Sequence, residues 1–158
     1  MSMAERKALC LEMVAAWNRW DLSGIIKHWS PDIVHYSEDN EVSSADMVKL
    51  MEGGLKAFPD LQLEVKSIMA EEDRVALRIT VTATHQGEFM GVQPTGQRVS
   101  WHLVEELRFV DGKVVEHWDV INMRPLLVRL GKLPDVPKVV LEASAKLAAA
   151  LEHHHHHH

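Results

Sequence analysis

The first third of the chain has the apolar pattern of helices. In residues 4–20 the apolar positions recur every three or four residues, which is typical of an amphipathic helix. The sequence predicts a second, short helix at 25–29 and a short strand over 32–37, which is rich in strand-forming residues. A third helix is expected over 43–58, capped by its first serine and stopped by Pro59.

From Leu61 onward the period of the apolar pattern changes from helical spacing to strict alternation, which predicts half-buried strands. Asp111–Gly112 is a strong signal for a hairpin between the last two strands. The glycine-rich segment 87–96 predicts a loop that could cover a pocket, and a helical tail is expected from Arg124. The expected strands begin at Leu61 and then cover 75–84, 99–109 and 114–123.

Helices followed by a meander of strands predict a single α+β domain over residues 1–145. We expect a cone-shaped barrel in which a strongly curved antiparallel sheet wraps the N-terminal helices. Its apolar interior would suit a hydrophobic small molecule. Residues 146–158 (KLAAALEHHHHHH) are interpreted as a vector-derived linker and a histidine tag.

Composition narrows the possible partners. The net charge is −6 and basic residues do not cluster, so a nucleic-acid partner is not expected. An apolar run long enough to span a membrane is also missing from the sequence, which predicts a cytoplasmic protein. Cys10 is the single cysteine, which excludes an intrachain disulfide.

Glu105 is the first candidate for chemistry, because it interrupts a strand face that is otherwise apolar from Val99 to Phe109. Both faces of the following strand are mixed, so the turn must decide which of its residues share the cavity with Glu105. A two-residue turn at Asp111–Gly112 would place Glu105 opposite Trp118.

A longer turn over 110–112 pairs Phe109 with Lys113 and sets Glu105 opposite His117. We favour this register because it gathers three ionisable groups at one apolar cavity. A slip of one residue would turn all of them to the other face. The same register sets Asp119 beside Leu103 and Ile121 beside Trp101.

Glu105, His117 and Asp119 are therefore the predicted catalytic residues. Burial disfavours the charged form of a carboxylate, so Glu105 or Asp119 could exchange protons near neutral pH, where His117 also titrates. These three residues together are typical of an enzyme that removes a proton from a carbon acid. In the alternative interpretation, His117 only neutralises one carboxylate in a structural pair.

A metal site is the less favoured interpretation of the same residues, and we expect none. An open iron site would need a second histidine beside His117, which would have to be His35, His85 or His102. The sequence contains no dinucleotide or phosphate-loop motif, so no tightly bound cofactor is expected. The predicted substrate-binding residues are Trp101, Leu103, Ile121, Met90 over the mouth, and by strand alternation either His35 or Tyr36.

Four segments of the chain resemble the SnoaL-like polyketide cyclases. They are AFPDL (57–61), EDRV (72–75), THQGEFMGVQPTGQRV (84–99) and RFVDGKVVEHWD (108–119). The resemblance implies the cone-shaped α+β barrel of the nuclear-transport-factor-like superfamily, commonly a homodimer. It also implies that Asp119 is the acid/base residue of an intramolecular aldol ring closure. The histidine that usually accompanies this aspartate is replaced here by Glu105.

Overall, the chain looks most similar to a small subgroup of anthracycline hydroxylases that share the cyclase fold. This resemblance implies oxygenation of an aromatic polyketide in antibiotic biosynthesis, with molecular oxygen as co-substrate and a separate NADPH-dependent reductase. Aldol cyclisation is the first alternative, and non-catalytic binding of a polyketide is the second. We expect the homodimer to form through the outer sheet face, which would carry Arg78, Thr80, Thr82, Thr84 and Arg108.

Overall fold

The computed structural model describes residues 1–156, so His157 and His158 of the expected tag lie outside the described residues. The helices are α1 (Met3–Asn18), α2 (Ser23–Ile26), α3 (Ser44–Ala57), α4 (Arg124–Arg129) and α5 (Val136–His156). The strands are β1 (Trp29–Ser37), β2 (Asn40–Val42), β3 (Gln62–Glu71), β4 (Arg74–Thr84), β5 (Arg98–Val110) and β6 (Lys113–Asn122).

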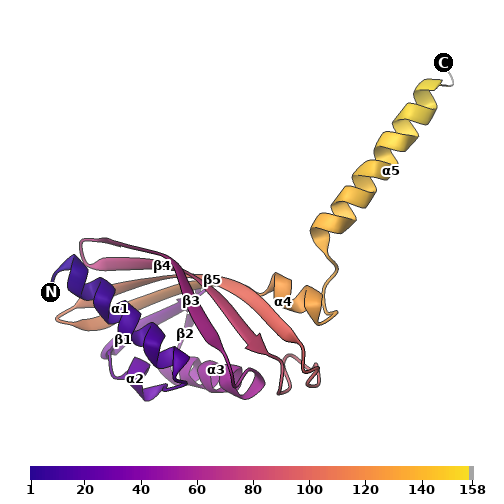
Figure 1. Cartoon of the computed structure of the whole chain (residues 1–158). Coiled ribbons are helices and arrows are strands. Elements are labelled where there is room, and N and C mark those ends of the chain that lie inside the picture. Colours follow the sequence, from indigo (N-terminus) through magenta and orange to yellow (C-terminus); the bar gives the residue numbers. More distant parts are fainter. Residues whose placement is uncertain (157–158) are drawn as a thin grey trace.

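The six strands form one curved sheet in the order β2-β1-β6-β5-β4-β3, and α1, α2 and α3 lie against one face of it (Figure 1). The α+β class is therefore confirmed. Two details of the expected barrel differ: the sheet stays open, and β1 pairs in parallel with β6. The end of α1 is joined to the edge strand β3, because the Asn18 side chain donates a 3.0 Å hydrogen bond to the carbonyl of Leu63 and accepts a 2.7 Å hydrogen bond from its backbone N–H.

The hydrophobic core lies between the sheet and these helices. On β4, every second residue from Val75 to Ala83 is at most 1% exposed, as the period of two predicts. The third helix begins as expected, because the Ser43 hydroxyl accepts a hydrogen bond of 3.1 Å from the backbone N–H of Asp46.

The predicted three-residue turn between β5 and β6 is wrong. Val110 pairs with Lys113 around the two-residue turn Asp111–Gly112. Both turn residues have positive φ, 49° and 76°, as a type I′ turn requires. This turn matches the right-handed twist of the strands, which explains why it is preferred over the longer loop.

A β-bulge nevertheless brings the expected side chains to one face. The register shifts between Phe109 and Arg108, so that Glu105 pairs with Asp119. The predicted neighbours are each displaced by two residues: Leu107 stands opposite His117, and Leu103 opposite Ile121. A displacement of two conserves the face toward which a side chain points.

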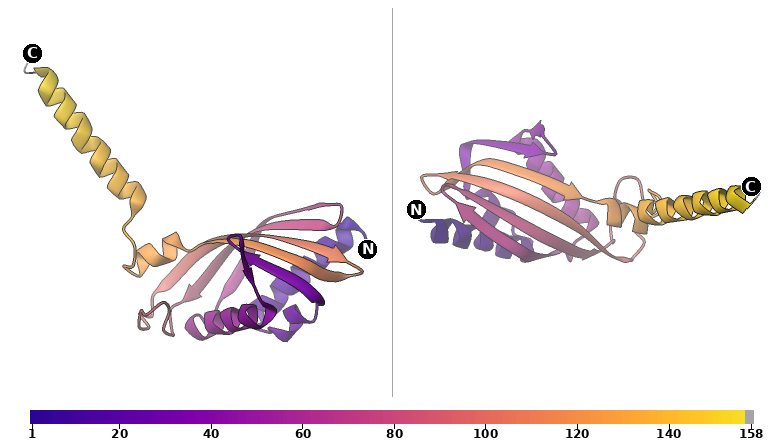
Figure 2. Two further views of the ribbon diagram at one scale, coloured as in Figure 1. Left: turned by 180° about the vertical axis from the view of Figure 1, so that it is seen from behind. Right: turned by 90° about the horizontal axis from the view of Figure 1, so that it is seen from above.

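Beyond the sheet, α4 packs its fully buried Leu126 against the domain, and α5 projects away from it (Figure 2). Part of the expected linker and tag, residues 146–156, continues α5. Among the helices within residues 1–156, none has the length and apolarity needed to cross a bilayer.

The loop after β4 crosses the end of α3 at a glycine. Backbone N–H groups of Gln86 and Gly87 both donate 3.0 Å hydrogen bonds to the carbonyl of Ala57, and a Cβ at Gly87 would overlap the carbonyl oxygen of Lys56. We expect Gly87→Ala to lower the free energy of unfolding by about 1–3 kcal/mol in urea titrations. Gly54→Ala is the control, because a Cβ there has nothing within 4 Å and alanine favours a helix. Equal unfolding curves for the two variants would contradict the close approach at Gly87.

Candidate active site

A cavity of about 700 Å³ lies between the concave face of the sheet, α1, α3 and the loop after β4. Its walls are mostly apolar and include two aromatic residues from the sheet side, Trp29 and Trp101. A polar group formed by Glu105, His117 and Asp119 interrupts this apolar lining. Five methionines also line the cavity, namely Met13, Met47, Met51, Met90 and Met123.

The three predicted catalytic residues contact one another. Nε2 of His117 lies 3.5 Å from Oε2 of Glu105 and 3.5 Å from Oδ2 of Asp119. Their side chains are only 14%, 23% and 10% exposed, respectively. The Ser37 hydroxyl donates a 2.6 Å hydrogen bond to Oδ1 of Asp119 from the adjacent strand β1. One imidazole is thus shared between two carboxylates at the cavity wall.

His35 lies behind His117, on the strand that pairs with β6. The two residues are direct neighbours in the β1–β6 register, and their Nδ1 atoms are 3.1 Å apart. Nε2 of His35 lies 3.2 Å from the hydroxyl oxygen of Ser44, the first residue of α3. His35 is completely buried, and its ring and that of Trp29 pack at an interplanar angle of 65° with the centroids 4.5 Å apart.

The surroundings raise the pKa values of Asp119 and His117 and lower the pKa of His35. Burial raises the pKa of Asp119 above its ordinary value, although the Ser37 hydroxyl and His117 act against burial. Burial alone would lower the pKa of His117, but the hydrogen bond to Glu105 and the charges of Glu105 and Asp119 outweigh burial and hold it above 6.5. Burial and the charge on His117 lower the pKa of His35 to about 4. The two carboxylates therefore favour the imidazolium form of His117, whereas His35 is neutral at neutral pH.

The low pKa of His35 predicts a loss of stability in mild acid. The unfolded chain binds the proton at the ordinary pKa of 6.5, whereas the folded chain binds it only near 4, so stability falls as the pH falls from 6.5 to 4. The contribution of this group to that loss is up to about 3 kcal/mol. Urea titrations at pH 4.5, 5.5 and 6.5 should show a smaller loss for His35→Leu than for the unchanged protein. Parallel losses would contradict a neutral His35.

The structure separates the two alternatives on β1. His35 is on the cavity side, beneath His117, whereas Tyr36 is on the other face and stacks on Trp118 with the ring centroids 4.2 Å apart. Tyr36 is therefore not placed to contact a ligand in this cavity, and His35 reaches it only through His117. The remaining predicted binding residues all line the cavity, namely Trp101, Leu103, Ile121 and Met90.

Of the three histidines considered as a second metal ligand, His35 is the one that adjoins His117. His85 accepts a hydrogen bond from the backbone N–H of Thr95, and His102 contacts Thr80 on the outer face of the sheet. Within the described residues, no group of three or more potential ligands is arranged to hold a metal ion.

Two polar residues of the site were missed in the sequence. Ser37 follows His35 by two positions, so the alternation of β1 could have placed both on one face. Ser44 becomes a neighbour of His35 only because α3 begins beside β1, which no local pattern indicates.

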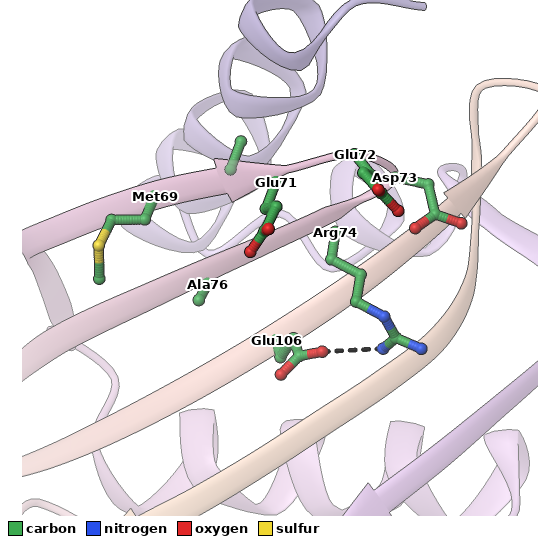
Figure 3. A pocket seen from close by; sticks show the side chains of 8 residues that line it. Met69, Glu71, Glu72, Asp73, Arg74, Ala76 and Glu106 are labelled. Atoms are coloured by element: carbon green, nitrogen blue, oxygen red, sulfur yellow. Dashed lines mark hydrogen bonds and ion pairs between the residues drawn. The ribbon is translucent and has the colours of Figure 1, made fainter.

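A second, shallower pocket lies on the opposite face, near the hairpin between β3 and β4 (Figure 3). Its carboxylates surround Arg74, which forms a 2.8 Å ion pair with Glu106. Because its basic group is already paired and its walls are strongly charged, this pocket is poorly suited to an apolar ligand. The cavity beneath the helices is the better candidate for a substrate site.

A model of the SnoaL-like polyketide cyclases matches residues 7–130. The chain belongs to the SnoaL-like polyketide cyclase family. It is 26% identical to aklanonic acid methyl ester cyclase AcmA of Streptomyces galilaeus over 134 residues, which cover 82% of this chain and 93% of the relative. It is 28% identical to nogalonic acid methyl ester cyclase of Streptomyces nogalater over 112 residues, which cover 63% and 84%.

Among solved structures, the IdmH protein of Streptomyces antibioticus superposes with a TM-score of 0.71 at 27% identity, covering 79% of this chain and 97% of IdmH. Family and fold agree with the resemblance found in the sequence. Both curated relatives are named as cyclases, so they favour ring closure over the hydroxylation that was expected first.

Proposed function

We propose that this SnoaL-like family member is a polyketide cyclase that closes a ring of an aromatic polyketide by intramolecular aldol addition. The observation that carries the proposal is the sharing of His117 by two carboxylates on the wall of a largely apolar cavity. A base, a proton donor and a water-poor space of about 700 Å³ are what such a reaction needs.

In this mechanism, Asp119 removes a proton from the carbon beside a carbonyl group of the substrate. Because burial raises the pKa of Asp119, the carboxylate is a stronger base than an exposed aspartate. The resulting enolate carbon attacks a ketone carbon within the same molecule and forms the new C–C bond. The ketone oxygen takes a proton from Nε2 of His117, and the proton held on Asp119 then restores the imidazolium.

The proposed ring closure needs no cofactor, because its atoms and electrons balance without one. One C–H bond and one C=O π bond are lost, one C–C bond and one O–H bond are formed, and the product is an isomer of the substrate. Molecular oxygen and an NADPH-dependent reductase, which hydroxylation would require, have no role in it. Glu105 contributes by keeping His117 protonated, since its carboxylate contacts the same Nε2 atom.

The decisive experiment uses aklanonic acid methyl ester and nogalonic acid methyl ester, the compounds in the names of the two relatives. Each is incubated with the protein without oxygen and NADPH, and the product is analysed by mass spectrometry and NMR. An isomer with one additional ring supports the proposal. A product that carries one atom of labelled oxygen, formed only in air with reductase and NADPH, would establish hydroxylation instead. Tight binding of the unchanged ester would identify a binding protein.

We also propose that two copies of the chain associate through the outer face of the sheet. In the register of β4, β5 and β6, Arg78 stands beside Val104, which stands beside Val120. These two valines are 50% and 60% exposed, which makes this part of the outer face partly apolar. Light scattering should give the mass of a dimer at micromolar concentration, and Val120→Lys should give a monomer.

A further inference from the structure

His35 is a buried titratable residue that the proposed ring closure does not use. It does not line the cavity, it is completely buried, and both of its ring nitrogens have polar partners. A buried polar side chain is costly unless its hydrogen bonds are satisfied, so these two partners determine what His35 can do.

A protonated His117 fixes the positions of the protons on both rings. The 3.1 Å contact between the Nδ1 atoms of His35 and His117 can hold only one hydrogen. An imidazolium at His117 carries a proton on each nitrogen, so its Nδ1–H must be the donor in this contact. His35 then has a bare Nδ1 and carries its single proton on Nε2, where the Ser44 hydroxyl oxygen accepts it at 3.2 Å.

We infer that His35 is a positioning residue for the proposed ring closure: its bare Nδ1 accepts the Nδ1–H of His117 and thereby keeps His117 protonated, with Nε2–H directed toward the carboxylates and the substrate. This inference rests on the proposed function, because it concerns the proton donor of that reaction. His35 acts through His117 and does not touch the substrate.

The other groups around His117 cannot replace His35. The β5 and β6 carboxylates, Glu105 and Asp119, contact the opposite nitrogen, Nε2. Cys10 of α1 is neutral, since burial raises its pKa to about 12, and Glu38 acts on Asp119. The α3 helix presents the Ser44 hydroxyl, which contacts His35.

Ser44 extends the same chain of hydrogen bonds to the start of α3. It is the first residue of α3, and this helix contributes Met47 and Met51 to the lining. If Ser44 lost its oxygen, Nε2–H of His35 would have no acceptor in a buried site. His35 would then favour the tautomer that carries its proton on Nδ1, which opposes the proton on Nδ1 of His117.

The test compares His35→Leu, His35→Asn and Ser44→Ala in the full chain. NMR spectra of ¹⁵N-labelled imidazole report the titration of His117 without any substrate. We expect His35→Leu to lower the pKa of His117, and His35→Asn to restore much of it because its amide oxygen can lie near the position of Nδ1. Ser44→Ala should lower this pKa by a smaller amount. His28→Leu, which removes a partly buried histidine outside the site, should leave the His117 signals unchanged.

Activity gives a second readout. In His35→Leu, the alkaline limb of the pH–rate profile should move to lower pH, and kcat above pH 7 should fall by about tenfold or more, as expected for a lost hydrogen bond to a charged group. An unchanged titration of His117 in both His35→Leu and Ser44→Ala would overturn the inference. If His35→Leu does not fold, the comparison of Ser44→Ala with His35→Asn decides. If the two esters are not cyclised at all, the proposed function fails while the NMR result still stands on its own.

Discussion

Replacing Asp119 by asparagine should lower kcat for ring closure by about two to four orders of magnitude, which is the usual effect of losing a general base. Asparagine keeps the shape of the side chain and can still accept the hydrogen bond of the Ser37 hydroxyl. It cannot take a proton from carbon. Because burial disfavours the charge of Asp119, the variant should unfold at the same temperature as the unchanged protein or at a slightly higher one.

Two further variants test whether the loss of kcat is specific to Asp119. Asp60→Asn is the matched control, because Asp60 is a hydrogen-bonded aspartate that receives bonds of 2.7 and 2.6 Å from Thr84, outside the cavity lining. We expect it to reduce stability and leave kcat unchanged. Glu105→Gln should cause a smaller loss of kcat than Asp119→Asn. Equal turnover by Asp119→Asn and the unchanged protein would exclude Asp119 as the base, and a larger loss in Glu105→Gln would assign that role to Glu105.

Which side chains of β5 and β6 face the cavity depends only on whether the pairing register is odd or even, so an error of two residues leaves the face unchanged. The prediction of a cluster of Glu105, His117 and Asp119 survived an incorrect turn, since the shorter turn and the bulge after Val114 each shift the register by one residue in the same direction, which makes two residues in all. The cross-strand pairs were not predictable in this way. They depend on the number of residues in both the turn and the bulge, and the bulge left no mark in the apolar pattern.

The contacts of His35 could not be predicted from the sequence, for a different reason. They require β1 to pair in parallel with β6 although His35 and His117 are 82 positions apart in the sequence, and local periodicity contains no information on strand order. The short strand β2 was also missed, because three residues are too few for a period to be recognised. The resemblance to the cyclase family supplied the overall fold at the point where local patterns became ambiguous.

Replacing His117 by leucine should be the most destabilising change in the site. It leaves Glu105 and Asp119 paired across adjacent strands without the imidazolium that contacts both. Removing one partner of a buried ion pair costs about 3–5 kcal/mol of stability, because an uncompensated charge remains. His28→Leu is the control, since the His28 side chain is 15% exposed, close to the 14% of His117, and its partner Glu12 is 53% exposed. Urea titrations at pH 6.5 should therefore show a much larger loss for His117→Leu.

The pH dependence of the stability lost in His117→Leu distinguishes the effect of the missing charge from the effect of altered packing. Without the imidazolium, the pKa of Asp119 rises further, so the folded variant binds a proton that the unfolded chain releases at its ordinary pKa of 3.8. Stability of the variant is therefore lost as the pH rises above 3.8, and its difference from the unchanged protein should shrink as the pH falls toward 4.5 and Asp119 takes up a proton. The unchanged protein loses stability above pH 6.5 as His117 gives up its proton, so the difference should shrink there as well. A difference that stays constant from pH 4.5 to 9 would mean that leucine acts through packing alone, and that His117 carries no charge in the folded protein.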